Sequence, residues 1–143
     1  SYLVTNGPTF SPDGDWLYHT DSGRGRVYRF ALRADGTLGA RSLFIQFEEG
    51  WGAPDGMTTD AEGHLWIAHW GGGRVSRFDP QGRLDRSVPL PATNITSCTF
   101  AGPGLDRMFV TSASLDTDGG DAQGALFEID PGVTGLAPIA FAG

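Results

Sequence analysis

Lysine is absent from the 143-residue sequence, and cysteine occurs only once. Without lysine, the chain cannot form a Schiff base with a carbonyl substrate through a side-chain amine. The single cysteine, Cys98, excludes an internal disulfide, and a reducing, cytoplasmic compartment is the default expectation. Cys98 lies in the strand-like stretch TSCTF, so we expect a buried thiol and not a nucleophile.

Long apolar runs and capped helical patterns are also missing. A transmembrane helix needs about 18 consecutive apolar residues, and the sequence has no such run. The net charge is −7, from 17 acidic residues against 10 arginines. Nucleic acids and anionic membranes bind basic surfaces, so we expect neither as a partner, whereas an acidic surface is compatible with a cation.

Glycine is abundant, with 22 residues, and it is accompanied by 9 prolines and 11% aromatic residues. Hydrophobic residues make up 39% of the chain, which is enough for a packed core. Many aromatic residues separated by glycine-rich turns favour an all-β chain of short strands.

A pattern of strands and glycine turns occurs three times. The segment NGPTFSPDGDWLYHTDSGRGRVYRF aligns with DGMTTDAEGHLWIAHWGGGRVSRF, and a weaker copy runs from TSCTFAGPG to GALFEIDPG. Each of the first two copies predicts an apolar strand, WLYHTD or LWIAHW, followed by an alternating strand, RVYRFAL or RVSRFDP. Four-stranded repeats of about 40 to 50 residues are typical of β-propeller blades. We therefore predict about three blades, over residues 1–45, 46–90 and 91–143.

Three blades do not close a propeller, since known rings have about four to eight blades. Three blades alone leave strand edges open, and the first residues read as the interior of a strand. We therefore expect that a missing N-terminal half or a second chain is needed to close the ring.

The runs NGPTFSPDG, PDGMTTDAEGHLWIAHWGGGRVSRFDPQGR, TSCTFAG and the closing FAG resemble the senescence-marker-protein (regucalcin) and gluconolactonase family. The resemblance covers essentially the whole chain but only the C-terminal half of the family's usual length. It implies half of a six-bladed β-propeller that hydrolyses a sugar lactone with one divalent cation on its axis. Bacterial arabinonolactonases and gluconolactonases are the members that it resembles most.

In this family an Asn-Gly motif and a Pro-Asp-Gly motif supply metal ligands, which correspond here to Asn6 and Asp55. A third ligand, a glutamate of the first blade, has no counterpart in this sequence. The repeat alignment independently places Asn6 and Asp55 at equivalent positions of successive blades. Their oxygens suit Ca²⁺, Mg²⁺ or Mn²⁺, and Zn²⁺ is a further candidate. The alternative is two ordinary turn residues, because both motifs are common in turns.

Asp55 is also the candidate catalytic residue, as the general base on the water that attacks the lactone carbonyl. His69 and Trp70 are candidate substrate-binding residues, although packing within the sheet is the stronger alternative for both. Asp21 follows a strand and is expected to bond to backbone in the blade turn. Two other functions stay open: a related propeller esterase acting on organophosphates or other esters, and a calcium-binding or interaction propeller without catalysis.

Overall fold

The structure is a computed structural model that describes residues 1–117 and 120–138, so the closing FAG motif lies outside the described residues. Strands form three antiparallel sheets in chain order, joined by short turns and one turn of 3-10 helix, η1 (Ser22–Arg24). The first sheet contains β1 (Thr5–Phe10), β2 (Trp16–Asp21), β3 (Arg26–Leu32) and β4 (Leu38–Gln46). The second contains β5 (Ala53–Thr59), β6 (Leu65–Trp70), β7 (Arg74–Phe78) and β8 (Leu84–Pro89). The third contains β9 (Asn94–Ala101), β10 (Arg107–Ala113) and β11 (Leu126–Ile129).

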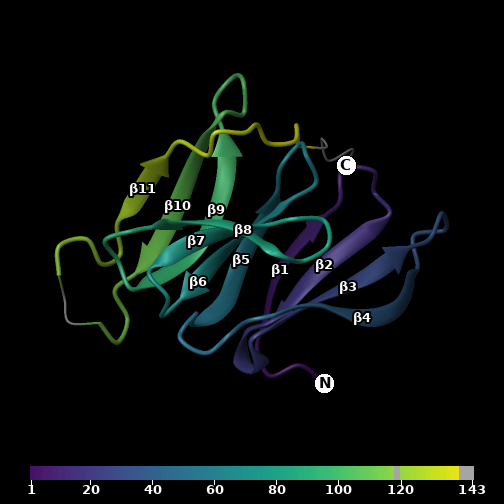
Figure 1. Cartoon of the computed structure of the whole chain (residues 1–143), viewed down its shortest axis with the longest axis horizontal. Helices are drawn as coiled ribbons and strands as arrows, with labels where there is room; N and C mark the ends of the chain where they lie inside the picture. The colour runs from purple at the N-terminus through teal and green to yellow at the C-terminus, as the bar shows by residue number, and fades with distance from the viewer. Residues whose placement is uncertain (118–119, 139–143) are drawn as a thin grey trace, which may run out of the picture.

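The three sheets stand side by side like the segments of a fan (Figure 1). In each sheet the strands follow one another outward in chain order from β1, β5 or β9. These three inner strands are neighbours, with β1 packed beside β5 and β5 beside β9. The arrangement is that of propeller blades, and it confirms the predicted all-β, partial β-propeller fold. No helix of the described residues is long and apolar enough to cross a membrane.

Two hydrophobic cores hold the sheets together, one on each side of the second sheet. Leu65 and Ile67 of β6 belong to the core shared with the first sheet. Trp66 and Ala68 belong to the core shared with the third sheet. Successive side chains of a strand point to opposite faces, so a strand with two buried faces is apolar at every position. This explains why LWIAHW lacks the alternation of the outer strands.

The segment after β11 ties the third sheet back to the second. The backbone N–H of Ala61 donates to the carbonyl of Thr134 at 2.9 Å, and Gly135 donates to Leu105 at 2.7 Å. Asp60 and Gly135 also form an isolated antiparallel bridge. These contacts join the turn between β5 and β6 to the turn between β9 and β10.

Cys98 is buried in the second core, as expected, with 5% of its surface exposed. Its thiol donates a weak hydrogen bond to the carbonyl of Trp66 at 3.5 Å. Burial raises the pKa of Cys98 to about 12, so the thiol stays protonated and unreactive at neutral pH.

Candidate functional site

Asn6 and Asp55, the two predicted metal ligands, line one cavity where β1 and β5 lie side by side. The cavity has a volume of about 380 Å³, and its walls are mainly apolar. The remaining lining residues are Val4, Ser22, Gly23, Ala53 and Trp70.

The lining residues come from equivalent positions of the first two repeats. Asn6 in β1 corresponds to Asp55 in β5, and both face the cavity. Ser22, directly after β2, corresponds to Trp70 at the end of β6, and both of these also line the cavity. Two blades therefore contribute the same two positions to one site.

Asn6 and Asp55 lie inside strands, so the alternative of two ordinary turn residues is wrong. The pairing of β1 with β2 changes register between Asn6 and Thr9, and that of β5 with β6 changes between Pro54 and Met57. Such a β-bulge bends the strand and re-aims its side chains, and bulges are common beside active sites. The motifs therefore specify bulges that aim both side chains into the cavity.

The third repeat carries the same irregularity at Thr96, a residue that the sequence analysis did not single out. The pairing of β9 with β10 passes from Ser97 to Ile95 and leaves Thr96 as the extra residue. The Thr96 hydroxyl lies 2.6 Å from that of Thr111, so it is engaged within its own sheet. The alignment of the third repeat, anchored at Phe100, was the signal for this position.

The glycines that follow Asn6 and Asp55 allow the inner strands to approach closely. A Cβ on Gly56 would lie 2.5 Å from the Ser97 hydroxyl oxygen and 2.8 Å from the Thr96 carbonyl oxygen. A Cβ on Gly7 would lie 3.2 Å from the Met57 terminal methyl carbon. Packing of one blade against the next therefore requires glycine at Gly56, whereas at Gly7 the backbone φ of +81° favours glycine.

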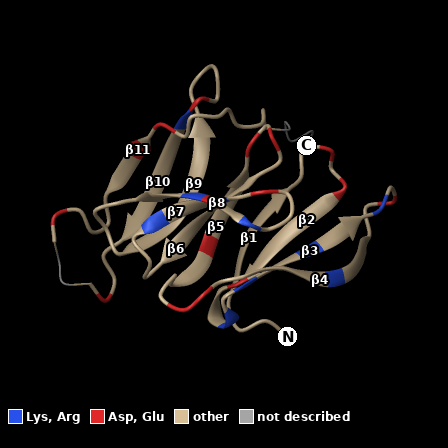
Figure 2. Cartoon of the chain, viewed as in Figure 1, with Lys and Arg blue, Asp and Glu red and all other residues tan. Residues whose placement is uncertain are grey.

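The Asp55 carboxylate has an unusual environment. Most acidic residues lie on loops (Figure 2), whereas Asp55 lies within β5. Burial raises its pKa to about 6, although the Gly56 N–H donates a hydrogen bond that lowers it. No arginine of the described residues contributes to its titration, whereas Asp60 is paired with Arg77 at 2.8 Å. A half-buried carboxylate without a cationic partner is a favourable ligand for an external cation.

The Asn6 amide is held from one side only. Its Nδ2 donates to the Ser22 hydroxyl at 3.0 Å, and that hydroxyl donates to the carbonyl of Pro54, next to Asp55. The hydrogen bond uses the nitrogen side of the amide, so the oxygen remains available to a ligand in the cavity.

The structure separates the two candidate substrate-binding residues. Trp70 lines the cavity, whereas His69 is completely buried. The ring centroids of His69 and Phe47 are 4.5 Å apart, with the two rings tilted by 32°. His69 Nδ1 lies 2.8 Å from the Trp51 carbonyl oxygen, and burial lowers the pKa of His69 to about 4. Neighbouring residues of a strand face opposite ways, so His69 and Trp70 do not share one surface. In this structure the side chain of His69 packs against the loop before β5.

Asp21 has a structural role, as predicted, but the backbone that it bonds to belongs to the N-terminal segment and not to the blade turn. The buried carboxylate accepts hydrogen bonds from the backbone N–H of Leu3 at 3.1 Å and from Arg24 at 2.6 Å. Burial alone would raise the pKa of Asp21, but these donors outweigh it and lower the pKa. The pair fixes the N-terminal segment and η1 beside the cavity.

The described residues fit part of a divalent cation site. The Asn6 amide oxygen and the Asp55 carboxylate are hard oxygen donors of the kind that Ca²⁺ and Mg²⁺ prefer. Among residues 1–117 and 120–138, no three His, Cys, Asp or Glu side chains are grouped so that they could hold a metal. A cation bound here would therefore need further ligands from water, from substrate or from another set of blades.

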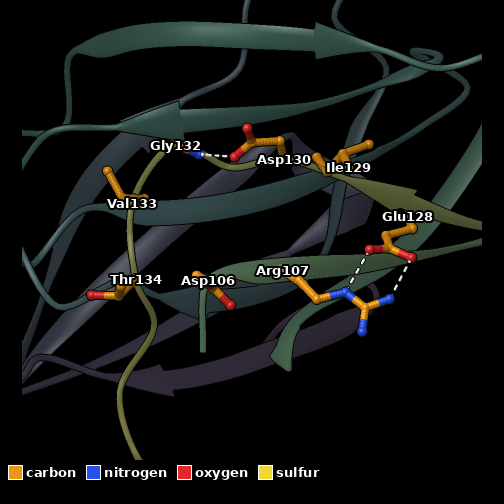
Figure 3. A pocket seen from close by; sticks show the side chains of 8 residues that line it. All are labelled: Asp106, Arg107, Glu128, Ile129, Asp130, Gly132, Val133 and Thr134. Atoms are coloured by element: carbon orange, nitrogen blue, oxygen red, sulfur yellow. Dashed lines mark hydrogen bonds and ion pairs between the residues drawn. The ribbon is translucent and has the colours of Figure 1, made fainter. Parts of the chain in front are cut away.

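A larger cavity of about 630 Å³ lies at the outer side of the third sheet (Figure 3). Arg107 lies between Asp106 and Glu128 along one side of it, and Val133 and Thr134 lie on the other side of Asp106. Arg107 donates to both Glu128 oxygens, at 2.6 and 2.7 Å, so these two charges satisfy each other. None of the predicted site residues lines this cavity, and we do not assign the chemistry to it.

Comparison with known proteins gives consistent similarities. The model of the SMP-30/gluconolactonase/LRE-like region matches residues 1–114. A pentonolactonase, XacC, of Haloferax volcanii is 39% identical over 142 residues, which cover 92% of this chain and 49% of that protein. Regucalcin of Xenopus laevis is 41% identical over 150 residues, which cover 98% of this chain and 50% of that protein.

A solved structure shares the fold closely. It is a calcium-binding protein, regucalcin, from Agrobacterium tumefaciens, with a TM-score of 0.87 and 35% identity. The match covers 94% of this chain and 48% of that one. The chain thus spans about half the length of the curated relatives that it matches.

Proposed function

We propose that this chain, which belongs to the SMP-30/gluconolactonase/LRE-like family, supplies part of the active site of a metal-dependent sugar-lactone hydrolase. The observation that carries the proposal is the cavity that Asn6 and Asp55 share. Both residues line it from equivalent bulges of two blades, and no arginine among residues 1–117 and 120–138 contributes to the titration of the Asp55 carboxylate. The names of two relatives, a pentonolactonase and a calcium-binding regucalcin, support the substrate class and the metal.

In this proposal Asn6 and Asp55 hold the divalent cation through the amide oxygen and the carboxylate. When bound, the cation polarises the lactone carbonyl and makes water more acidic. In this proposal Asp55 also takes a proton from the attacking water, as the one carboxylate among the described residues that lines the cavity. The water oxygen bonds to the carbonyl carbon, the bond from that carbon to the ring oxygen breaks, and Asp55 returns the proton to the departing ring oxygen, which becomes a hydroxyl group.

The apolar walls position the sugar ring and exclude water. Trp70, Val4 and Ala53 surround the two polar ligands, and a tryptophan offers a flat face for the C–H groups of a sugar. His69 does not contact the cavity, and its Nδ1 instead holds the loop before β5 through the Trp51 carbonyl oxygen. Trp70 is therefore the residue of this chain that we assign to substrate contact.

Closure of the ring requires more blades than the three described sheets. We infer that a further set of blades, from a longer form of the protein or from a second copy of this chain, completes a six-bladed ring. That set would supply the remaining cation ligands. A native mass equal to one chain, together with cation binding, would show that neither is needed.

The test combines binding with turnover. Mn²⁺ and Ca²⁺ are titrated calorimetrically into the chain and into its Asp55→Ala variant, with Asp35→Ala as a control on an exposed loop. A panel of pentono- and hexonolactones is then assayed with and without a chelator. Metal-dependent turnover that is lost in Asp55→Ala supports the proposal. Saturable binding without turnover of any lactone, by a form whose native mass shows the completed ring, would favour the calcium-binding propeller, and hydrolysis of other esters alone would favour the esterase.

A further inference from the structure

We propose that Ser22 is a positioning residue of the cation site, which fixes the orientation of the Asn6 amide and ties it to the backbone next to Asp55. The inference rests on the proposed function, in that Asn6 and Asp55 are taken as the cation ligands. Ser22 stands outside the ligand set, and its role follows from the direction of two hydrogen bonds.

The first hydrogen bond fixes the hydroxyl proton. Ser22 Oγ lies 2.5 Å from the carbonyl oxygen of Pro54, and a carbonyl oxygen can only accept. The single proton of the Ser22 hydroxyl is therefore committed to Pro54. Toward any other group, the Ser22 oxygen can therefore only accept a hydrogen bond.

The second hydrogen bond then fixes the amide. Asn6 Nδ2 lies 3.0 Å from Ser22 Oγ, and the hydroxyl has no second proton to give. Asn6 must therefore present its NH₂ group to Ser22, because the reversed amide would set two acceptors against each other. The carbonyl oxygen of the amide is left free for the cavity, which is the orientation that a cation ligand requires.

The turn that carries Ser22 is itself held firmly. The Ser22 backbone N–H donates to the Val4 carbonyl at 2.9 Å, and the Gly25 N–H donates to the Ser22 carbonyl at 3.1 Å. Beside it, the buried Asp21 carboxylate is paired with Arg24 at 2.6 Å. Ser22 therefore acts from a rigid support and restrains both ligand-bearing strands, β1 through Asn6 and β5 through Pro54.

The matching position of the second blade strengthens the assignment. Trp70 corresponds to Ser22 in the repeat and lines the same cavity, but it has no hydroxyl and cannot form the two hydrogen bonds of Ser22. A serine at Ser22 is thus not demanded by blade packing. We assign the serine hydroxyl instead to the hydrogen bond with Asn6.

The experiment compares Ser22→Ala and Ser22→Thr with the unmodified chain. Ser112→Ala is the matched control, because the Ser112 hydroxyl also donates to a backbone carbonyl, that of Ala125 at 2.9 Å, outside the cavity lining. The first readout is the pair of side-chain amide NMR signals of Asn6 in chelator, assigned by their loss in Asn6→Ala. The second is the Kd for Mn²⁺.

In Ser22→Ala we expect a clear shift of the Asn6 amide signals and Mn²⁺ affinity about 10- to 100-fold weaker, as for other groups that orient metal ligands. Ser22→Thr keeps the hydroxyl and should restore both values, while Ser112→Ala should leave both unchanged. Restoration by threonine separates positioning from a general loss of packing.

Unchanged Asn6 signals in Ser22→Ala, or an unchanged Kd, would overturn the inference. Shifted Asn6 signals in a chain that binds no Mn²⁺ at all would show that Ser22 orients the Asn6 amide but would refute the proposed cation site. The two failures are therefore distinguishable.

Discussion

Replacing Asp55 with asparagine should stabilise the metal-free chain at neutral pH. The carboxyl has an ordinary pKa of 3.8 when unfolded, and burial raises it to about 6 in the folded chain. Between about pH 4 and pH 6 the folded state therefore holds more protons at this residue than the unfolded state does. Stability contributed by the protonated carboxyl is consequently lost as the pH rises through this range.

The magnitude follows from the size of the shift. A difference of about 2 pKa units corresponds to about 3 kcal/mol, since each unit is worth about 1.4 kcal/mol. Asp55 is only half-buried, and solvent screening reduces the expected effect to about 1 to 1.5 kcal/mol. Asp55→Asn should gain this amount at pH 7.5 and little at pH 4.

The assay is urea unfolding followed by tryptophan fluorescence, with chelator present, at four pH values from about 4 to 7.5. Asp35→Asn is the control of opposite sign, because hydrogen bonds from Thr37 lower the pKa of Asp35 and favour its charged form. Equal stability of the Asp55 variant and the unmodified chain at pH 7.5 would refute the reasoning, and so would a gain that grows as the pH is lowered.

Three further predictions concern packing and reactivity. Gly56→Ala should lower the free energy of unfolding by about 1 to 3 kcal/mol, because the added Cβ would lie 2.5 Å from the Ser97 hydroxyl oxygen. Arg77→Leu should cost about 3 to 5 kcal/mol in urea unfolding, since it leaves the buried Asp60 carboxylate unpaired. Cys98 should react with a thiol reagent only as fast as the chain unfolds, because burial raises its pKa to about 12.

Control variants test the predictions for Gly56 and Arg77. Gly104→Ala has a Cβ no closer than 3.3 Å to the Asp106 side chain and should be nearly neutral. Arg83→Leu removes an exposed ion pair with Asp79 and should cost less than about 1 kcal/mol. A Gly56 or Arg77 variant no less stable than its control would contradict the packing argument, and rapid labelling of native Cys98 would contradict its burial.

The blades were predictable because their signal is local. WLYHTD and LWIAHW coincide with β2 and β6, and their recurrence at a fixed spacing gives the architecture. Asn6 and Asp55 were singled out by the Asn-Gly and Pro-Asp-Gly motifs of the family that the sequence resembles, and the repeat alignment placed them at equivalent positions. Their local conformation could not be predicted, because Asn-Gly and Asp-Gly serve equally well in a turn and at a bulge.

The supporting contacts were not predictable because they join residues far apart in the chain. Ser22 meets Asn6 across 16 residues and Pro54 across 32, and no local pattern encodes either contact. The separation of His69 from Trp70 shows a related limit. Both lie at the end of one apolar strand, and only the tertiary packing shows which side chain faces the cavity and which is buried.

The double burial of β6 determines how the chain opens. Its amide protons can meet solvent only when both cores separate, since Leu65 and Ile67 belong to one and Trp66 and Ala68 to the other. Strand β8 and the first part of β4, before the core residue Ile45, have mostly exposed side chains and can detach while the cores persist. We expect hydrogen exchange in β6 to report global unfolding and exchange in β8 and the first part of β4 to report local opening. Strand β6 is thus the last to lose its structure, and it pairs with β5, the strand that holds Asp55.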